Sequence, residues 1–189
     1  PFVNIPTTLL SQVDASVGGK TGVDLGGIKN IIGLFSLPCM VVVHAGFLTS
    51  LPQEEILSGF AEMLKHGLIR SRKHWEDLSG TKDFSFEKTE KLIYDSVRIK
   101  YDVVREDPTE KGLRKTLNFG HTVGHAIEAC SEFKIFMAHD KKNSRKGINF
   151  TLLEAIGEAS IDHYLDPEAI RRSILFYNAA GAEDAPREE

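Results

Sequence analysis

The first fifty residues contain two short apolar runs with the pattern of buried strands. Residues 2–5 and residues 40–44 are dominated by valine, isoleucine and other large apolar side chains, which favour strands covered on both faces. Residues 18–27 between these runs contain closely spaced glycines, which preclude a regular helix and let the backbone approach a ligand. The pattern predicts the end of an α/β domain over residues 1 to about 50.

From Leu51 onward the apolar positions change to helical spacing. Pro52 suits the first turn of a helix. The apolar residues then repeat at intervals of three and four positions up to about Ile69. They are Ile56, Leu57, Phe60, Met63, Leu64 and Leu68.

The same periodicity continues through most of the remaining chain. It predicts a second helix over about 86–104, a third over 117–130, and further helical segments near 148–159 and 167–177. We therefore expect an all-α domain over residues 51–189, and a chain that is mostly helical overall.

Composition and charge exclude several classes of protein. The chain is 41% hydrophobic and 26% charged, as is usual for a globular protein. A net charge of -4 gives no general attraction to nucleic acid or to an anionic membrane, so a bound anion needs local basic residues. No apolar run approaches the length of a membrane span. Cys39 and Cys130 lack metal-type spacing, so we expect two buried, reduced thiols in a cytoplasmic protein.

Two histidines form the clearest chemical motif. His121 and His125 are four positions apart, so in a helix they project from one face and suit a metal ion or a polar ligand. The alternative is a solvated pair of helical histidines. Gly120 and Gly124 favour the ligand, because each weakens a helix by about 1 kcal/mol relative to alanine, a cost that close approach of a ligand would explain.

A carboxylate and a lysine form the second motif. Glu62 and Lys65 are one helical turn apart and share a face. The alternative is a surface ion pair worth a few tenths of a kcal/mol. Apolar residues flank Glu62 on both sides, which favours an inward direction, and a buried carboxylate needs a cation or a metal.

The remaining basic residues are weaker signals. Lys20, Lys29 and Asn30 accompany the glycines, and such combinations bind phosphates and carboxylates. The P-loop spacing fails because position 14 is aspartate. Lys100 comes late in a predicted helix, where a cation is favoured in any case. Arg114 precedes the histidine motif.

Together these segments resemble the 3-dehydroquinate synthase family. The three segments at residues 5–24, 59–67 and 117–128 are similar to its signature blocks, in the same order and at similar separations. The resemblance covers residues 1 to about 130. It implies that the α/β part belongs to a nucleotide-binding domain and that the helical part binds metal and substrate.

The resemblance implies a role for each matching position. Glu62 and His121 correspond to zinc ligands, whereas His125 corresponds to a histidine that faces the substrate; spacing alone would make both histidines ligands. Substrate-contacting positions are matched by Asp14, Lys20, Lys29, Asn30, Lys65, Lys100, Arg114 and Asn118. The NAD site is matched by Thr7, Thr8, Phe47, Leu48, Thr49 and Ser50, and shares Lys20 and Lys29.

The implied reaction converts 3-deoxy-arabino-heptulosonate 7-phosphate to 3-dehydroquinate with release of phosphate, a step toward aromatic amino acids. The reaction needs NAD and zinc or cobalt as cofactors. Besides a small sugar phosphate as substrate, the expected partner is a second subunit of a homodimer, and neither nucleic acid nor a membrane is expected. The glycine-rich pyrophosphate turn of the family has no match here. We therefore expect a piece that lacks the N-terminal half, does not bind NAD in full and is incomplete as an enzyme.

A third zinc ligand is the weakest expectation. The family supplies it from a His-Gly-Glu block, and the nearest candidate here is His139, which the Gly-Glu pair does not follow. The alternative is that His139 is a solvated loop residue. His163 is a weaker substitute, because it falls in a later predicted helix.

Three other interpretations remain open. A metal-dependent polyol dehydrogenase of similar architecture would need metal and NAD but no dense set of anion-binding side chains. A cyclase for another sugar phosphate would share most of the motifs. A folded, non-catalytic remnant would lack zinc and NAD binding, which distinguishes it from either enzyme.

Overall fold

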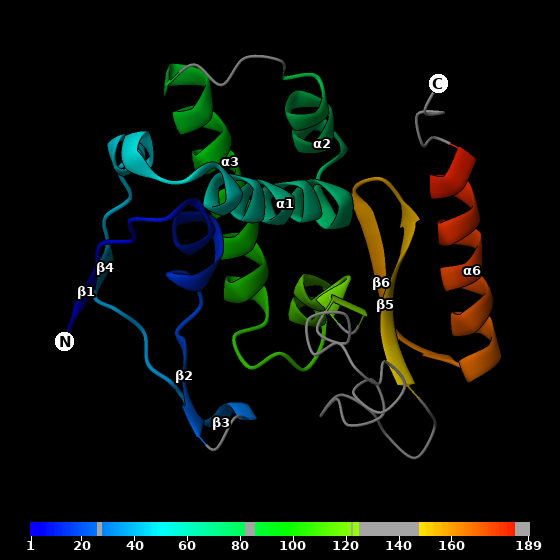
Figure 1. Ribbon diagram of the computed structural model, residues 1–189. Helices are drawn as coiled ribbons and strands as arrows, with labels where there is room; N and C mark the ends of the chain where they lie inside the picture. The colour runs from blue at the N-terminus through cyan, green and yellow to red at the C-terminus, as the bar shows by residue number, and fades with distance from the viewer. Residues whose placement is uncertain (26–27, 82–85, 122, 125–147, 184–189) are drawn as a thin grey trace. The chain divides into compact units, whose positions relative to one another are not determined.

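The computed structural model describes residues 1–25, 28–81, 86–121, 123–124 and 148–183 (Figure 1). The chain divides into two compact units, residues 1–117 with 153–160 and residues 118–152 with 161–189. The division at about residue 50 that the sequence predicts stays a prediction.

The strands near the N-terminus form two separate pairs. β1 (Val3–Asn4) and β4 (Met40–Val41) pair in parallel, which confirms the two strands predicted there, although both are short. β2 (Lys20–Leu25) and β3 (Ile28–Phe35) pair antiparallel through most of the glycine-rich segment. Of the glycines in this segment that the structure describes, Gly22 lies in a strand, which the helix-breaking pattern alone did not specify.

Three helices form the body of the first unit. α1 (Gln53–Arg70) and α3 (Phe86–Glu106) confirm the two helices predicted there. α1 crosses α3 and contacts α2 (Arg72–Ser79) (Figure 1). The pattern did not reveal α2, which begins where Ser71 leaves the helical conformation and its Oγ accepts the His74 backbone N–H at 3.2 Å. Serine is a favoured cap at this position.

Short helical turns connect these elements. They are η1 (Ser11–Ala15), η2 (Ala45–Ser50) and η3 (Leu113–Asn118). The core forms where they meet the helices, from Leu9, Val13, Ala45, Met63, Leu78, Leu92 and Ile93. Gly59 allows α1 to lie close to η1, since a Cβ atom there would be 2.5 Å from Leu9 Cγ.

The expectation of helix near 148–159, and with it an all-α domain after residue 50, is wrong. β5 (Ile148–Ala155) and β6 (Glu158–Leu165) form a two-stranded sheet instead. Gly157 has a φ of 92°, which favours a tight turn over a continuing helix. Ile148 and Phe150 alternate with polar residues, and both pack with Ile170. The spacing of the apolar residues is compatible with a helix and with a strand. The turn at Gly157 favours the two strands.

The final helix is α6 (Pro167–Glu183), which confirms and extends the helix predicted over 167–177. The helix predicted over 117–130 is interrupted at its start, because Gly120 has a φ of 77° and separates η3 from the helical residues His121, Val123 and Gly124. Residues 125–130 lie outside the described part of the chain. No helix among the described residues is long and apolar enough to cross a membrane.

The expectation of a buried Cys39 is also wrong. Its side chain is exposed, and its Sγ donates to the Phe2 carbonyl at 3.1 Å. Cys130 lies outside the described residues.

Candidate metal and substrate site

Glu62 and Lys65 form a buried ion pair on α1. Their side chains are only 12% and 9% exposed, and Lys65 Nζ contacts Glu62 Oε1 directly. Lys65 Nζ also donates to the Leu117 carbonyl at 2.7 Å, which ties α1 to the end of η3. The pair is therefore not the solvated surface pair that the sequence left as an alternative.

A second ion pair joins two distant segments of the first unit; its lysine is buried, whereas the Asp14 side chain is 30% exposed. Lys100 on α3 lies 2.5 Å from both the carbonyl oxygen and Oδ1 of Asp14 in η1. Lys100 is 6% exposed, and burial lowers its pKa even though Asp14 and Glu62 favour the charged form. The cluster thus combines two carboxylates with two ammonium groups, which balances the buried charge.

The Glu62 carboxyl stays ionised in this environment. Burial by itself would raise its pKa, but the His66 ring and the Lys65 ammonium beside it hold that pKa far below its ordinary value. His66 is fully buried, and its Nε2 lies 3.5 Å from Glu62 Oε1. A buried carboxylate whose pKa is lowered in this way is suited to bind a cation.

The cluster offers donor atoms of the kind that zinc accepts. Asp14, Glu62 and His66 each provide one ligand atom, and these atoms lie within 4.8 Å of one another. His66 Nε2 is buried without a hydrogen bond of regular geometry, whereas Glu62 Oε1 is already in contact with Lys65 Nζ. Carboxylate oxygen and imidazole nitrogen are common zinc ligands, so the residues present fit a metal ion.

Arg114 forms a hydrogen bond with the glycine-rich segment. Its Nη2 donates to the Gly18 carbonyl at 2.9 Å and its Nη1 to the Pro108 carbonyl at 2.8 Å, while its guanidinium carbon lies 5.7 Å from the centre of the Phe35 ring. Gly18 has a φ of 109°, and a Cβ atom there would be 2.7 Å from Arg114 Nη2. Lys20, at the start of β2, forms an ion pair with Glu110. A substrate contact by Arg114 or Lys20 stays a prediction.

The two segments predicted for the cofactor are tied together by a residue that the sequence did not single out. Gln12 is fully buried, and its Nε2 donates to the His44 carbonyl at 3.0 Å and to the Pro6 carbonyl at 3.4 Å. These carbonyls immediately precede Thr7 and η2. Thr8 Oγ1 donates to Ser11 Oγ and Thr49 Oγ1 to the Gly46 carbonyl. Thr7, Phe47 and Ser50 are exposed, whereas Leu48 packs against the core.

The second unit contains the described histidine of the sequence motif. His121 is half-buried, and its Nδ1 lies 3.3 Å from the Phe119 carbonyl. A carbonyl only accepts, so Nδ1 is the donor in this contact, as is common for imidazoles that bind a metal through Nε2. Asn118 ends η3 three residues before His121. His163, the weaker substitute for a third ligand, lies in strand β6 and not in a helix.

Several predicted residues lie outside the described part of the chain. They include His125 and His139. For Lys29 and Asn30 the structure describes the strand backbone but not the side chains. Glu62 and His121 belong to different compact units, so their binding to one metal ion stays a prediction.

Ser96 and His74 are buried polar residues that the sequence reading missed. Ser96 follows Leu92 by one helical turn and precedes Lys100 by one turn, so all three lie on one buried stripe of α3. A polar residue in an apolar stripe was the available signal. His74 gave none, because α2 was not expected.

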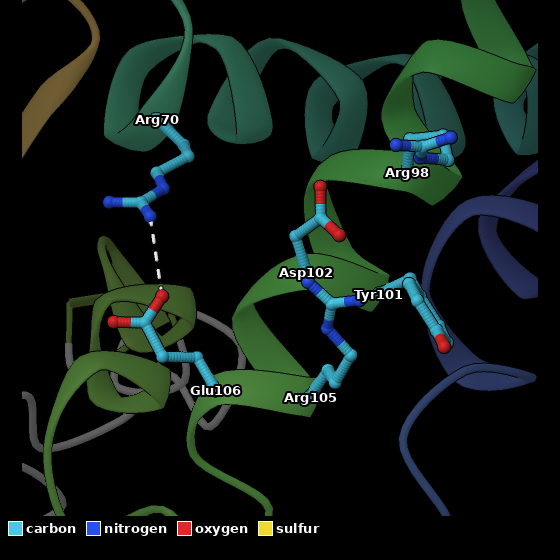
Figure 2. Close-up of a pocket in the computed structure, with 6 residues that line it drawn as sticks. All are labelled: Arg70, Arg98, Tyr101, Asp102, Arg105 and Glu106. Atoms are coloured by element: carbon cyan, nitrogen blue, oxygen red, sulfur yellow. Dashed lines mark hydrogen bonds and ion pairs between the residues drawn. The ribbon is translucent and has the colours of Figure 1, made fainter.

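A separate surface pocket of about 620 Å³ lies near the ends of α1 and α3 (Figure 2). Arg70, at the end of α1, lies 3.5 Å from the Glu106 carboxylate across it. The other lining residues come from α3: Arg98, Tyr101, Asp102 and Arg105. None of the predicted site residues lines this pocket.

Family comparisons agree with the geometry. Residues 1–58 match the family model described as 3-dehydroquinate synthase N-terminal, and residues 59–143 match the one described as 3-dehydroquinate synthase C-terminal. The 3-dehydroquinate synthase of Parabacteroides distasonis is 35% identical over 93% of this chain and 66% of its own length. That of Symbiobacterium thermophilum is 48% identical over 71% of this chain and 38% of its own length.

Solved structures show the same fold. A 2-epi-5-epi-valiolone synthase from Streptomyces hygroscopicus subsp. jinggangensis, with NAD+ and Zn2+ bound, matches with a TM-score of 0.84 and 20% identity over 95% of this chain and 67% of that one. A 2-deoxy-scyllo-inosose synthase, complexed with carbaglucose-6-phosphate, NAD+ and Co2+, matches with a TM-score of 0.79 and 19% identity over 91% and 66%. The family models cover residues 1–143, and the buried charge cluster is built from the segments that they match, so this chain belongs to the 3-dehydroquinate synthase family.

Proposed function

We propose that this chain contributes the metal- and substrate-binding part of a 3-dehydroquinate synthase. The proposed reaction converts 3-deoxy-arabino-heptulosonate 7-phosphate to 3-dehydroquinate and releases phosphate. The chain spans two thirds or less of the lengths of the relatives above, so the activity is proposed for the protein to which it belongs.

The buried cluster of Asp14, Glu62, Lys65 and Lys100 supports this proposal most directly. Its members come from three segments far apart in the sequence. Burying Glu62, Lys65 and Lys100 beside the half-buried Asp14 costs several kcal/mol of desolvation for each buried ion before pairing offsets it. A protein that needed only stability would gain more from apolar residues here, so the cluster favours a binding role.

For the metal, we propose Glu62 and His121 as zinc ligands, with His139 as the third. A catalytic zinc typically has three protein ligands and one open position. The His121 contact with the Phe119 carbonyl supports the use of its Nε2. Bound zinc would polarise a hydroxyl or carbonyl of the substrate, and bound NAD would supply a reversible oxidation.

For the substrate, we propose that the basic side chains neutralise its phosphate and carboxylate. Lys65 and Lys100 are held in place by Glu62 and Asp14, so little conformational entropy is lost when an anion binds. His125 is the proposed proton shuttle, since imidazole titrates near neutral pH. The other proposed contacts are Lys20, Lys29, Asn30, Arg114 and Asn118, and those to NAD are Thr7, Thr8, Phe47, Leu48, Thr49 and Ser50.

The main alternative is a cyclase for a different sugar phosphate. The fold fits those enzymes, but their 19–20% identity is far below the 35–48% identity to 3-dehydroquinate synthases. The number of basic side chains also favours a substrate with a carboxylate besides its phosphate. A polyol dehydrogenase would need neither group.

Calorimetric titration of the zinc-loaded chain tests the proposal. We expect the heptulosonate phosphate to bind at least tenfold more tightly than the analogous heptulose phosphate that lacks the carboxylate. Lys100→Met should weaken binding at least tenfold, because a buried cation is removed. Lys73→Met is the matched control, since Lys73 is exposed and pairs with the side chain of Asp77 on its own helix.

Two results would contradict the proposal. Equal affinity for both sugars would favour another cyclase. Failure to bind zinc or either sugar would identify a non-catalytic remnant.

We also propose a homodimer. Ile32, Leu34 and Phe35 on β3 are 58–61% exposed, and apolar patches of this kind often mark protein interfaces. Sedimentation equilibrium should show a dimer of the chain, and a monomer at all concentrations would contradict it.

A further inference from the structure

Behind Glu62 lies a buried row of three polar side chains contributed by α1, α3 and α2. His66 and Ser96 are fully buried, and His74 is 3% exposed. His66 Nδ1 lies 2.9 Å from Ser96 Oγ, and His74 Nε2 lies 3.3 Å from the same oxygen. At its other end the row meets Glu62 through His66 Nε2.

The direction of each hydrogen bond in this row follows from the carboxylate. Glu62 is ionised and has no hydrogen to donate, so the facing His66 Nε2 bears the ring hydrogen. Nδ1 of a neutral His66 ring then accepts, and the Ser96 hydroxyl donates to it. Ser96 Oγ in turn accepts from His74 Nε2–H.

The row ends at His74. Its Nδ1 is buried and has no hydrogen-bond partner among the described residues. The row therefore leads to no further group that the structure describes, and it is suited to hold one ring in one orientation and one tautomer. Imidazole rings in metal sites are commonly oriented by hydrogen bonds of this kind.

The orientation of the His66 ring matters for its contact with the Glu62 carboxylate. His66 Nε2 is buried without a regular hydrogen bond, and leaving such an atom unpaired costs about 1–3 kcal/mol. Glu62 Oε1, which also contacts Lys65 Nζ, lies 3.5 Å from it, so a small movement gives His66 Nε2 an acceptor. An N–H donated to one face of the carboxylate fixes the direction in which its other lone pairs point.

We infer that Ser96 and His66 are positioning residues: the Ser96 hydroxyl donates to His66 Nδ1 and so reinforces the tautomer that the carboxylate selects, in which His66 Nε2–H orients Glu62 toward the metal. This inference rests on the proposed function for the role of Glu62 as a zinc ligand. His66 supplies a hydrogen bond in this arrangement and does not bind the metal itself.

The tautomer can be measured without any metal. In the ¹⁵N-labelled chain at pH 8, two-bond ¹H–¹⁵N correlation spectra should show His66 with its hydrogen on Nε2; the His66→Gln spectrum identifies its signals. Ser96→Ala should give a mixture of tautomers, whereas Ser58→Ala, an exposed serine on α1, should change nothing. A wild-type ring with its hydrogen on Nδ1 would overturn the inference.

Zinc affinity, measured by competition with a chromophoric chelator, then separates this inference from the proposed function. Ser96→Ala and His66→Phe should each weaken zinc binding roughly 10–100-fold. His66→Gln should recover most of the loss, because its amide still donates an N–H. Ser96→Cys, close in size with a weaker donor, should give an intermediate loss and serves if Ser96→Ala does not fold.

Each other outcome has a distinct meaning. If Glu62→Gln leaves zinc affinity unchanged, the proposed function fails and the inference with it. If Glu62→Gln removes binding but Ser96→Ala and Ser96→Cys do not weaken it, only the inference is overturned. If His66→Gln loses as much as Glu62→Gln, His66 is itself a ligand and the inference is likewise overturned.

Discussion

His74 shows how burial changes the chemistry of a single side chain. Burial lowers the pKa of its ring from 6.5 to about 4, against the opposing attraction of Asp95. The folded protein therefore keeps His74 neutral at pH values where the unfolded chain protonates it. Since the unfolded state binds the extra proton, stability falls as the pH decreases from 6.5 to about 4, and the contribution is constant outside that range.

The pH dependence of unfolding by urea measures this effect. Wild type should lose about 3 kcal/mol between pH 7 and pH 4 through His74 alone. His74→Gln keeps a side-chain N–H donor but does not titrate, so its unfolding free energy should fall by about 3 kcal/mol less over the same range. Equal losses in the two proteins would show that His74 is not buried as a neutral ring.

A buried and an exposed ion pair of the first unit should contribute very differently to the free energy of unfolding. Lys65→Met removes the ammonium beside buried Glu62 and should cost roughly 3–5 kcal/mol of unfolding free energy, because an uncompensated charge is left inside. Lys73→Met breaks the exposed pair with Asp77, 2.8 Å long, and should cost less than about 1 kcal/mol. Similar losses from both variants, measured by urea unfolding, would contradict the buried pair.

At the scale of elements, α1 is held against η1 by the absence of a side chain. Helix propensity alone predicts that Gly59→Ala stabilises by about 1 kcal/mol. The structure predicts the opposite, a loss of roughly 1–3 kcal/mol, because the new Cβ would be 2.6 Å from the Leu10 backbone nitrogen. Thermal unfolding measures both. Ser58→Ala, exposed on the same helix, is the control and should be neutral or slightly stabilising.

The elements differ in how well the sequence predicted them. α1 and α3 were predictable within a few residues because their apolar residues repeat along one face over many turns. The hairpin of β5 and β6 was not predictable in this way. A short apolar run fits both the spacing of a helix and that of a strand, and the turn at Gly157 favours the two strands. α2 was missed because it is only eight residues long, which is too short to show a periodic pattern of apolar residues.

At the scale of the whole molecule, the proposed zinc ligands can be tested through their effect on stability. Zinc that binds only the folded protein should raise its melting temperature. We expect a rise in wild type, and none in Glu62→Ala or His121→Ala. His139→Ala should lose most of the rise, while His163→Ala should keep it. An unchanged response of His139→Ala would mean that another residue completes the site.

The sequence by itself determined the family, the two long helices and the identity of the charged residues, because these depend on residue type and on spacing along one chain. Only the tertiary structure decided which of those charges are buried and with what partners. Asp14 meets Lys100 across 86 positions of sequence, and Ser96 meets two histidines from two other helices. Such contacts depend on how the helices cross in the folded chain, and no period along the sequence encodes the crossing. His66 and Ser96 therefore became visible only once α1, α2 and α3 were packed together.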